Sequence, residues 1–418
     1  MERKYSSYWK IKSFILLIMI LQTFHPQVAF GQNEAFINEY LLGATEDARV
    51  IQRQEESQFL ENDPIKSSWI RETEIRMRTN QDRNSFDDYR FRLTPSNPWE
   101  VRANKAYHNQ LSETTNISYQ VALSKSLRNR YLNLTESYFL TKKSEILDRK
   151  IDLKTVRSEQ MLNFTSKLDG DNLLEIESDL SNLEIEKAEL DIKLLEVDHN
   201  ITKYIKSSIT WSNKALIDPP YIASLIVSND TSITRNIYKE LVTRELDLEN
   251  SMYKVSKAKA FSNIGFLQAD MDFDQGDSFD DHLGFQVGVT IPIVNKDKAD
   301  LARDRFELIE KKNEAQRSKT EVDQEVEILL KRIQSLIKMY DLLEEKLDRS
   351  EQMVESMTED PGESTLFKHR NYQLNLVLKK LDIHERLIKS YIDYLDIHGL
   401  LVAEPMVNYL SNDLSVIR

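Results

Sequence analysis

The sequence predicts a mainly α fold with a small β part, in which long antiparallel helical hairpins alternate with short strands. The first observation is the scarcity of helix breakers, since the 418 residues include only nine glycines and nine prolines. The ranges 99–169 and 296–360 contain neither residue. A helix of ~60 residues, at a rise of ~1.5 Å per residue, is on the order of 90 Å long. The second observation is the alternation of apolar residues with small or polar ones from Leu283 to Ile291, which is typical of a strand with two unlike faces.

Residues 1–31 are predicted to be a cleaved secretory signal peptide. A basic region precedes a short apolar core at 14–21 and a small-residue cleavage site at 29–31. The basic residues are Arg3, Lys4, Lys10 and Lys12. A membrane anchor is the alternative, but the apolar run is much shorter than the ~20 residues that span a bilayer.

The first half of the mature chain, residues 32–217, begins with a helix predicted at 38–60. Two strands are predicted next, at about 68–79 and 86–94, with a polar turn between them that is typical of a β-hairpin. Their apolar positions are few: Ile75 and Met77, then Tyr89, Phe91 and Leu93. Arg71 has the parity of Ile75, so it must lie near a membrane interface or break the pattern.

A helical hairpin is predicted over 99–211, with a turn at the glycine that interrupts the long helix. The outgoing leg repeats apolar residues every three or four positions, at Leu123, Leu127, Tyr131, Leu134 and Tyr138. The return leg carries a heptad seam with Lys187 as its one polar member; the apolar members are Ile176, Leu180, Leu183, Leu190, Leu194, Val197, Ile201 and Tyr204.

The second half, residues 218–418, repeats this order of elements. We expect a helix at 232–259, strands at about 263–274 and 282–293, a helical hairpin over 297–398 and a C-terminal extension. The outgoing leg again has an apolar seam, formed by Val322, Val326, Leu329, Ile333, Leu336, Tyr340, Leu343 and Leu347. The offset of ~190–200 residues between the halves is typical of a duplicated domain rather than a short solenoid repeat.

A signal peptide followed by two copies of helix, strands, long helix, glycine turn and return helix resembles the TolC family of outer-membrane efflux proteins. The best single match is the strand-to-helix junction GVTIPIVN at 288–295, and a second is the glycine in each hairpin turn, Gly170 and Gly362. The resemblance implies a homotrimer in which four strands per chain build a 12-stranded transmembrane β-barrel. It also implies that the hairpins form an α-barrel in the periplasm.

The same resemblance assigns roles to residues. The hairpin tips would contact a periplasmic adaptor protein: Leu168, Asp169, Gly170, Asp171, Asn172, Asp360, Pro361, Gly362, Glu363 and Ser364. The strand-to-helix junctions would be Pro95, Asn97, Pro98, Pro292 and Asn295, and the lipid-facing strand would present Leu283, Phe285, Val287, Val289 and Ile291. A turn needs glycine whether or not it binds a partner, so the tips also have a purely structural reading. Where the family commonly has acidic residues beyond the tips, this chain has Lys368 and Asn371, with only Glu175 in the first half.

Function is therefore expected to be transport: an outer-membrane channel subunit, with its helices in the periplasm, that works with an adaptor and an inner-membrane pump in efflux or type I secretion. The alternative is a periplasmic coiled-coil structural or adaptor-like protein without a barrel. The net charge of −13 disfavours nucleic acid as a partner. We find no catalytic or cofactor motif and no metal site, because His384-Glu385 lacks a second histidine. Asp270 and Asp272 are interpreted as the wet wall of a lumen.

Overall fold

The computed structural model describes residues 35–62, 69–79, 86–164, 170–205, 216–230, 235–260, 264–272, 283–289, 297–355 and 363–417. The predicted signal peptide lies outside these residues, as do Leu168, Asp169, Ile291, Pro292, Asn295, Asp360, Pro361 and Gly362. Long helices and a single four-stranded antiparallel sheet confirm the predicted fold class. The chain divides into two compact units, which we call the hairpin unit (Met1–Val50, Ala122–Arg235 and Glu325–Arg418) and the sheet unit (Ile51–Val121 and Asn236–Gln324).

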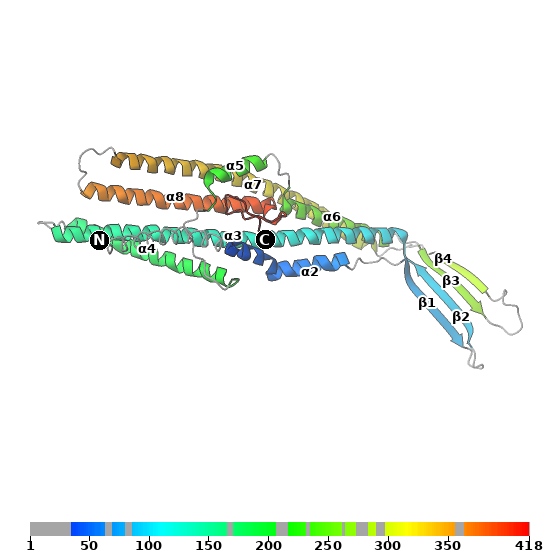
Figure 1. Ribbon diagram of the computed structural model, residues 1–418. Helices are drawn as coiled ribbons and strands as arrows, with labels where there is room; N and C mark the ends of the chain where they lie inside the picture. The colour runs from blue at the N-terminus through cyan, green and yellow to red at the C-terminus, as the bar shows by residue number, and fades with distance from the viewer. Residues whose placement is uncertain are drawn as a thin grey trace, which may run out of the picture. The chain divides into compact units, whose positions relative to one another are not determined.

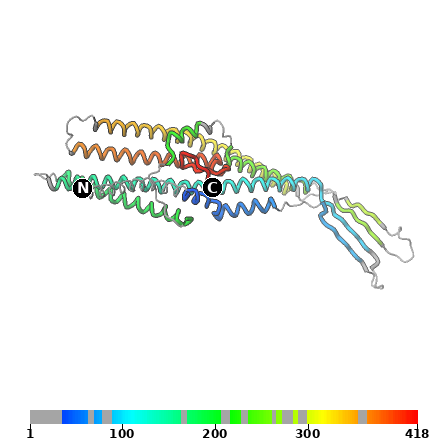
Figure 2. Tube along the Cα trace, viewed as in Figure 1, coloured from blue at the N-terminus to red at the C-terminus, as the bar shows by residue number. Residues whose placement is uncertain are grey.

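The sheet unit contains all four strands, in the order β1-β2-β3-β4. Their bounds are Ile70–Thr79 for β1, Phe86–Pro95 for β2, Ile264–Asp272 for β3 and Leu283–Val289 for β4. Figure 1 shows the strands side by side, and Figure 2 shows that the blue pair from the first half lies against the yellow-green pair from the second. The two halves of the sequence therefore build one continuous antiparallel sheet.

Helices complete the sheet unit. Two of them belong to both units, α3 (Pro98–Phe164) and α7 (Asp297–Glu355), while α2 (Ala48–Asn62) lies mostly in the sheet unit and α6 (Ile237–Ala260) wholly in it. A small core joins α3 to α6 through Ile117, Val121 and Ile237. The side-chain oxygen of Asn236 caps α6 by accepting from the amides of Tyr238 and Lys239, at 3.1 and 3.0 Å. This cap starts α6 at 237, five residues after the predicted start at 232.

In the hairpin unit, α3 and α4 (Gly170–Thr202) form an antiparallel pair with a polar ladder along one side. Serine and lysine side chains pair with carboxylates across the two helices, in one register: Ser137 with Asp198, Ser144 with Asp191, Lys187 with Asp148, Lys154 with Asp179, and Ser158 with Glu177. Lys187, the polar member of the predicted seam, is thus satisfied by an ion pair. Because only one alignment of the helices makes all these pairs, the ladder specifies the hairpin register.

The second hairpin, α7 with α8 (Glu363–Ile397), packs along its predicted seam. Leu329, Ile333 and Leu336 on α7 are 5% exposed or less. Polar pairs again link the legs, since Lys380 bonds to Glu344 at 2.9 Å and the His369 ring bonds to Ser350 at 2.8 Å. Figure 1 shows α7 and α8 side by side within this unit.

The N-terminal segment differs from the single helix predicted at 38–60. Helical residues 35–42 are followed by a 3-10 turn, η1 (Gly43–Glu46), and Asp47 is extended before α2 begins. Arg130 explains the break, because its guanidinium donates to the carbonyl oxygens of Tyr40 and Gly43 and to the Asp47 carboxylate. A helix that continued through 43–47 could not offer these acceptors to α3.

Helix α5 (Pro219–Asp230) begins directly after the predicted boundary between the halves, where no helix was predicted. Proline is well suited to the first turn of a helix, and the Asp218 carbonyl accepts from the amides of Tyr221 and Ile222 at 3.0 Å. The C-terminal extension then folds back on the start of α5. The amide of Ile217 donates to the Leu410 carbonyl at 3.0 Å. The side chain of Asn412 accepts from the backbone amide of Asp218 at 2.9 Å and donates to the Asp218 carboxylate at 2.8 Å.

The return leg also ends earlier than predicted. Helix α4 stops at Thr202, so Tyr204 lies beyond the seam, where its ring stacks 4.1 Å from the Arg130 guanidinium carbon. Tyr204 thus contributes a cation–π contact with a buried arginine rather than a position in the helical seam.

His384 makes the stability of the hairpin unit depend on pH. Its Nε2 donates to the Ile217 carbonyl at 2.9 Å, its ring packs on Phe139 and Tyr340, and burial lowers its pKa below the ordinary value of about 6.5. The charged groups near it are Asp218, whose field raises the pKa, and Lys380, whose field lowers it. The stability that neutral His384 contributes is therefore fully present above pH ~6.5, and it is lost as the pH falls through the lower pKa of the folded state.

We expect the melting temperature of the wild type to fall more steeply than that of His384→Gln between pH ~6.5 and 5, because glutamine cannot take up a proton. Thermal unfolding followed by circular dichroism at several pH values measures the difference. The exposed His199 on α4 provides the control, and His199→Gln should follow the wild type. Parallel pH profiles for the wild type and His384→Gln would contradict the assignment.

Candidate functional site: the sheet, its junction and the hairpin tips

One face of the sheet is apolar across all four strands. The register aligns Ile75, Phe91, Ala269 and Phe285 in one row, and it aligns Thr73, Leu93, Leu267 and Val287 in the next. Met77, Tyr89 and Met271 make a third row, which the backbone of Leu283 continues. The strands of the first half, which look marginal in isolation, thus extend the same apolar surface as β3 and β4.

This apolar face is strongly exposed in the single chain. Phe285 is 79% exposed, Val287 69% and Ile75 63%. A contiguous apolar surface of this kind marks contact with lipid or with another protein, because soluble chains bury such residues. Of the strand predicted to face lipid, Phe285 and Val287 lie on this surface, Leu283 and Val289 are paired in the β4 backbone, and Ile291 is outside the described residues.

The opposite face is polar and internally paired. Arg90 on β2 bonds to Asp270 on β3 at 2.8 Å, and Arg76 on β1 bonds to Glu74 at 2.6 Å. Gln268, which is 8% exposed, donates to both Asp270 carboxylate oxygens. Asp270 therefore accepts hydrogen bonds from Gln268 and Arg90 within the sheet.

The polar face also carries an aromatic residue. Phe266 pairs with Gly288 across β3 and β4, and a Cβ added to Gly288 would lie only 2.3 Å from the Phe266 ring. The Arg92 guanidinium carbon lies 3.8 Å from the centre of the same ring. A glycine inside a strand is a sign that another group approaches the backbone closely, and that sign was available in the sequence.

Gly288→Ala is expected to lower the stability of the folded protein by about 1–3 kcal/mol, because the new methyl must displace the Phe266 ring. Gly284→Ala is the matched control on the same strand and face, since its Cβ would meet Asp270 at an ordinary 3.8 Å. Melting temperatures of the two variants measure the difference. If both variants melt together, the ring does not require glycine at 288.

The junction between sheet and helix is described in the first half. β2 ends at Pro95, α3 begins at Pro98, and the side chain of Asn97 between them caps α3 by accepting from the Trp99 amide at 3.1 Å. The same Asn97 donates to the Ala258 carbonyl near the end of α6, also at 3.1 Å. Asn97 is 3% exposed, so it ties the start of α3 to the end of α6.

The described tip residues lie in the first turns of return helices. Gly170, Asp171 and Asn172 open α4, and Glu363 and Ser364 open α8. The turn was expected to need glycine, but Gly170 is the first residue of a helix and a Cβ there would meet open space. Within the hairpin unit both tips lie at one end, because Arg157 on α3 stacks 5.9 Å from the ring of Phe367 near the start of α8.

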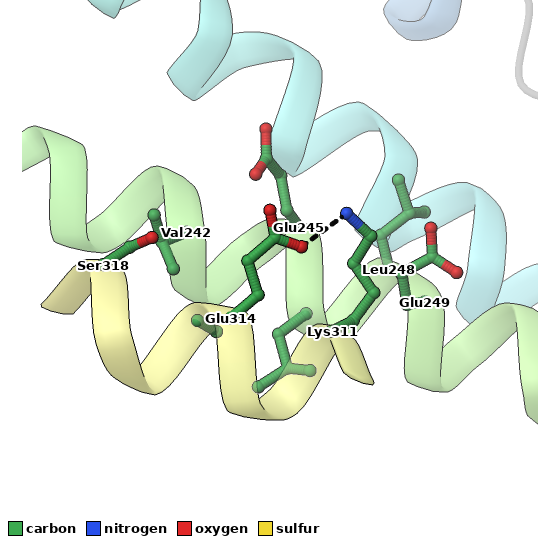
Figure 3. Close-up of a pocket in the computed structure, with 9 residues that line it drawn as sticks. Val242, Glu245, Leu248, Glu249, Lys311, Glu314 and Ser318 are labelled. Atoms are coloured by element: carbon green, nitrogen blue, oxygen red, sulfur yellow. Dashed lines mark hydrogen bonds and ion pairs between the residues drawn. The ribbon is translucent and has the colours of Figure 1, made fainter. Parts of the chain in front are cut away.

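A pocket of about 340 Å³ lies between α6 and α7 (Figure 3). Lys311 bonds to Glu314 at 2.8 Å, which raises the pKa of the lysine, and Glu245 and Glu249 face the pair from α6. The ion pair is exposed, so it contributes little to stability. Within the described parts of the chain, no group of three or more histidine or acidic side chains could hold a metal ion.

The described residues thus include a sheet with an exposed apolar face, long helical hairpins and one junction, between β2 and α3, that Asn97 caps. No protein-family model matches the sequence, and no curated sequence matches it either. Among the helices that the structure describes, none is both long and apolar enough to cross a bilayer.

Solved structures supply the comparison. The chain is similar to the open state of the MtrE outer membrane channel of Neisseria gonorrhoeae, at 11% identity and a TM-score of 0.59, over 92% of this chain and 90% of that one. It is similar to CusC, whose structures concern transmembrane channel formation, at 12% identity and a TM-score of 0.59, over 88% of this chain and 92% of that one. It is also similar to the outer membrane protein VceC of Vibrio cholerae, at 11% identity and a TM-score of 0.57, over 88% of this chain and 96% of that one. The chain therefore has the TolC-like fold in a divergent form, as the sequence motifs predicted.

Proposed function

We propose that this chain is the outer-membrane channel subunit of a tripartite efflux or type I secretion system, and that it forms a passive trimeric conduit. The observation that carries the proposal is the exposed apolar face that runs across all four strands, from Ile75 to Phe285. Such a face next to a polar, paired face suits a barrel wall between lipid and a wet lumen. The predicted signal peptide supports export from the cytoplasm.

The edges of the sheet support a homotrimer. β1 and β4 each pair with one neighbour in the described chain, and a strand edge in lipid must be paired. Three copies would supply 12 strands, which lies within the range of transmembrane barrels. Parity requires that Ile75 of one chain and Phe285 of the next lie on the same face at the closure.

Exposed apolar stripes on the hairpins support side-by-side packing of several chains. Apart from its buried seam, α4 exposes Leu174, Ile185, Ile192 and Leu195, and α7 exposes Ile328, Met339, Leu342 and Met353. Helices with two apolar seams suit a closed ring, because each helix then has a neighbour on both sides. The ring would be the periplasmic α-barrel, and its tips would meet the adaptor protein and, through it, the inner-membrane pump.

The decisive experiment is fractionation followed by conductance. We expect the full chain in the outer-membrane fraction as a detergent-soluble trimer, and we expect that trimer to conduct ions across a planar bilayer without nucleotide. Release of a water-soluble monomer by osmotic shock would overturn the proposal and favour the periplasmic coiled-coil alternative. A trimer that never conducts would exclude the conduit.

Gly170→Lys tests the adaptor contact at the first tip. The fold should tolerate the change, because nothing lies within 4 Å of a Cβ at this position. We expect trimer yield to be unchanged and cellular export to fall towards that of a strain lacking the chain. Asn182→Lys, an exposed position along α4, adds the same charge away from the tip and should leave export intact. Normal export by Gly170→Lys would remove the adaptor role from this tip.

A further inference from the structure

A pocket lined by opposite charges lies in the sheet unit beside the Asn97 junction. It has a volume of about 490 Å³, and its charged lining consists of Arg71, Glu100, Lys259, Asp300 and Asp304. These residues come from four elements, namely β1, α3, α6 and α7. The volume falls within the ~300–1,000 Å³ of ordinary ligand pockets.

The placement of Arg71 is a departure from the strand pattern. The pairing of β1 with β2 shifts between Ile70 and Glu72, so Arg71 is the extra residue of a bulge. Bulges redirect side chains, and here the arginine that parity assigns to the apolar face instead lines the charged pocket. The bulge thus breaks the alternation at Arg71, which is one of the two alternatives that the sequence left for this residue.

The charged groups of this pocket are unpaired. No hydrogen bond or ion pair joins the five side chains to each other or to any other described residue. The pocket is lined by two cations and three carboxylates. A ligand with only a negative charge would pair with the cations and leave the carboxylates without a partner, and a ligand with only a positive charge would do the reverse. A ligand that carries both an anion and a cation matches both sets.

Two exposed tryptophans lie next to residues of this pocket in the sequence. Trp69 lies two residues before Arg71 and Trp99 directly before Glu100, and each is 67% exposed. They are the only tryptophans in the part of the chain that the structure describes, and this residue is enriched where a membrane meets water. Glu100 lies in the first turn of α3, a few residues beyond the end of β2 and its apolar face.

We propose that this pocket binds the headgroup of an amine-bearing zwitterionic phospholipid. Arg71 and Lys259 bind the phosphate, and Glu100, Asp300 and Asp304 accept hydrogen bonds from the ammonium group. The acyl chains extend along the apolar face of the sheet. The membrane location rests on the proposed function, whereas the headgroup chemistry rests on a pocket formed by one chain.

The test is calorimetric titration of the full purified chain, in EDTA, with dihexanoyl phosphatidylethanolamine below its micelle concentration. We expect it to bind roughly tenfold or more tightly than dihexanoyl phosphatidylglycerol, which has the phosphate but no amine. Asp300→Asn with Asp304→Asn should abolish that preference, and Lys259→Gln should weaken both lipids by roughly tenfold. Lys257→Gln and Glu310→Gln, exposed on the same helices but outside the pocket, should bind as the wild type does.

Equal affinity for the two lipids, or wild-type binding by the pocket variants, would overturn the proposal. Inorganic phosphate that competes as well as the intact lipid would assign the pocket to a free phosphate instead. The titration does not depend on assembly, because all lining residues come from one chain. A trimer without lipid preference would therefore defeat only this inference, while a soluble monomer that still prefers the amine headgroup would defeat only the proposed function.

Discussion

Phe285→Arg is expected to reduce the amount of trimer in the outer membrane to less than about a tenth of the wild-type level. Phe285 is 79% exposed, more than any other apolar side chain that the structure describes on this face. An arginine on the lipid face costs ~2–4 kcal/mol at the middle of the bilayer, and a trimer carries the cost three times. Fractionation of membranes and electrophoresis of unheated samples measure the assembled trimer.

Gln286→Arg is the matched control, because the next residue of β4 lies on the opposite, polar face. It adds the same side chain to the same strand and should change assembly little. Equal loss in both variants would mean that the strand tolerates no arginine, whatever the face. Normal assembly by Phe285→Arg would mean that this face does not meet lipid.

Arg130→Ala is expected to release the N-terminal segment from the hairpin unit, at a cost of roughly 3–5 kcal/mol. The Arg130 side chain is 4% exposed, and it donates to Tyr40, Gly43 and Asp47 at 2.6–2.8 Å. Its removal takes the donor away from the carbonyl oxygens of Tyr40 and Gly43, leaves Asp47 only the hydroxyl of Ser126, and takes away the cation between the rings of Tyr40 and Tyr204.

Hydrogen exchange of the amides at 40–47 measures this release, and we expect their protection to fall by a factor of about 100 or more. Arg130→Lys should give an intermediate loss, because a single ammonium cannot reproduce the guanidinium fork. The exposed Arg149 on the same helix supplies the control, and Arg149→Ala should leave the segment protected. Unchanged protection in Arg130→Ala would show that other contacts hold the segment.

Periodicity identified the long helices and their buried faces. Leu127, Tyr131 and Leu134 of the first predicted seam are 1% exposed or less, and Ile333 and Leu336 of the second are 2% or less. These faces were readable because burial in a helix recurs every three to four residues, whatever the partner is. The strands could be predicted in the same way, because side chains in a strand alternate between its two faces.

Other parts of the fold depended on contacts between distant residues. The break at Gly43–Glu46 exists because Arg130, 83 residues beyond Asp47, takes up the local carbonyls. Helix α5 was not predicted because Pro219 and Pro220 resemble helix breakers, whereas here they form the first turn of a helix. The pairing of Phe266 with Gly288 needed the register of β3 and β4.

By itself the sequence determined the mainly α class, the seams of both hairpins and the resemblance to outer-membrane channels, because these depend on local periodicity and on short motifs. Only the tertiary structure decided which residues share a face of the sheet, since a single shift of register moves every side chain to the other side. The bulge at Arg71 shows the difference. Parity along the strand assigned this arginine to the apolar face, and one extra residue in the pairing placed it in a charged pocket instead.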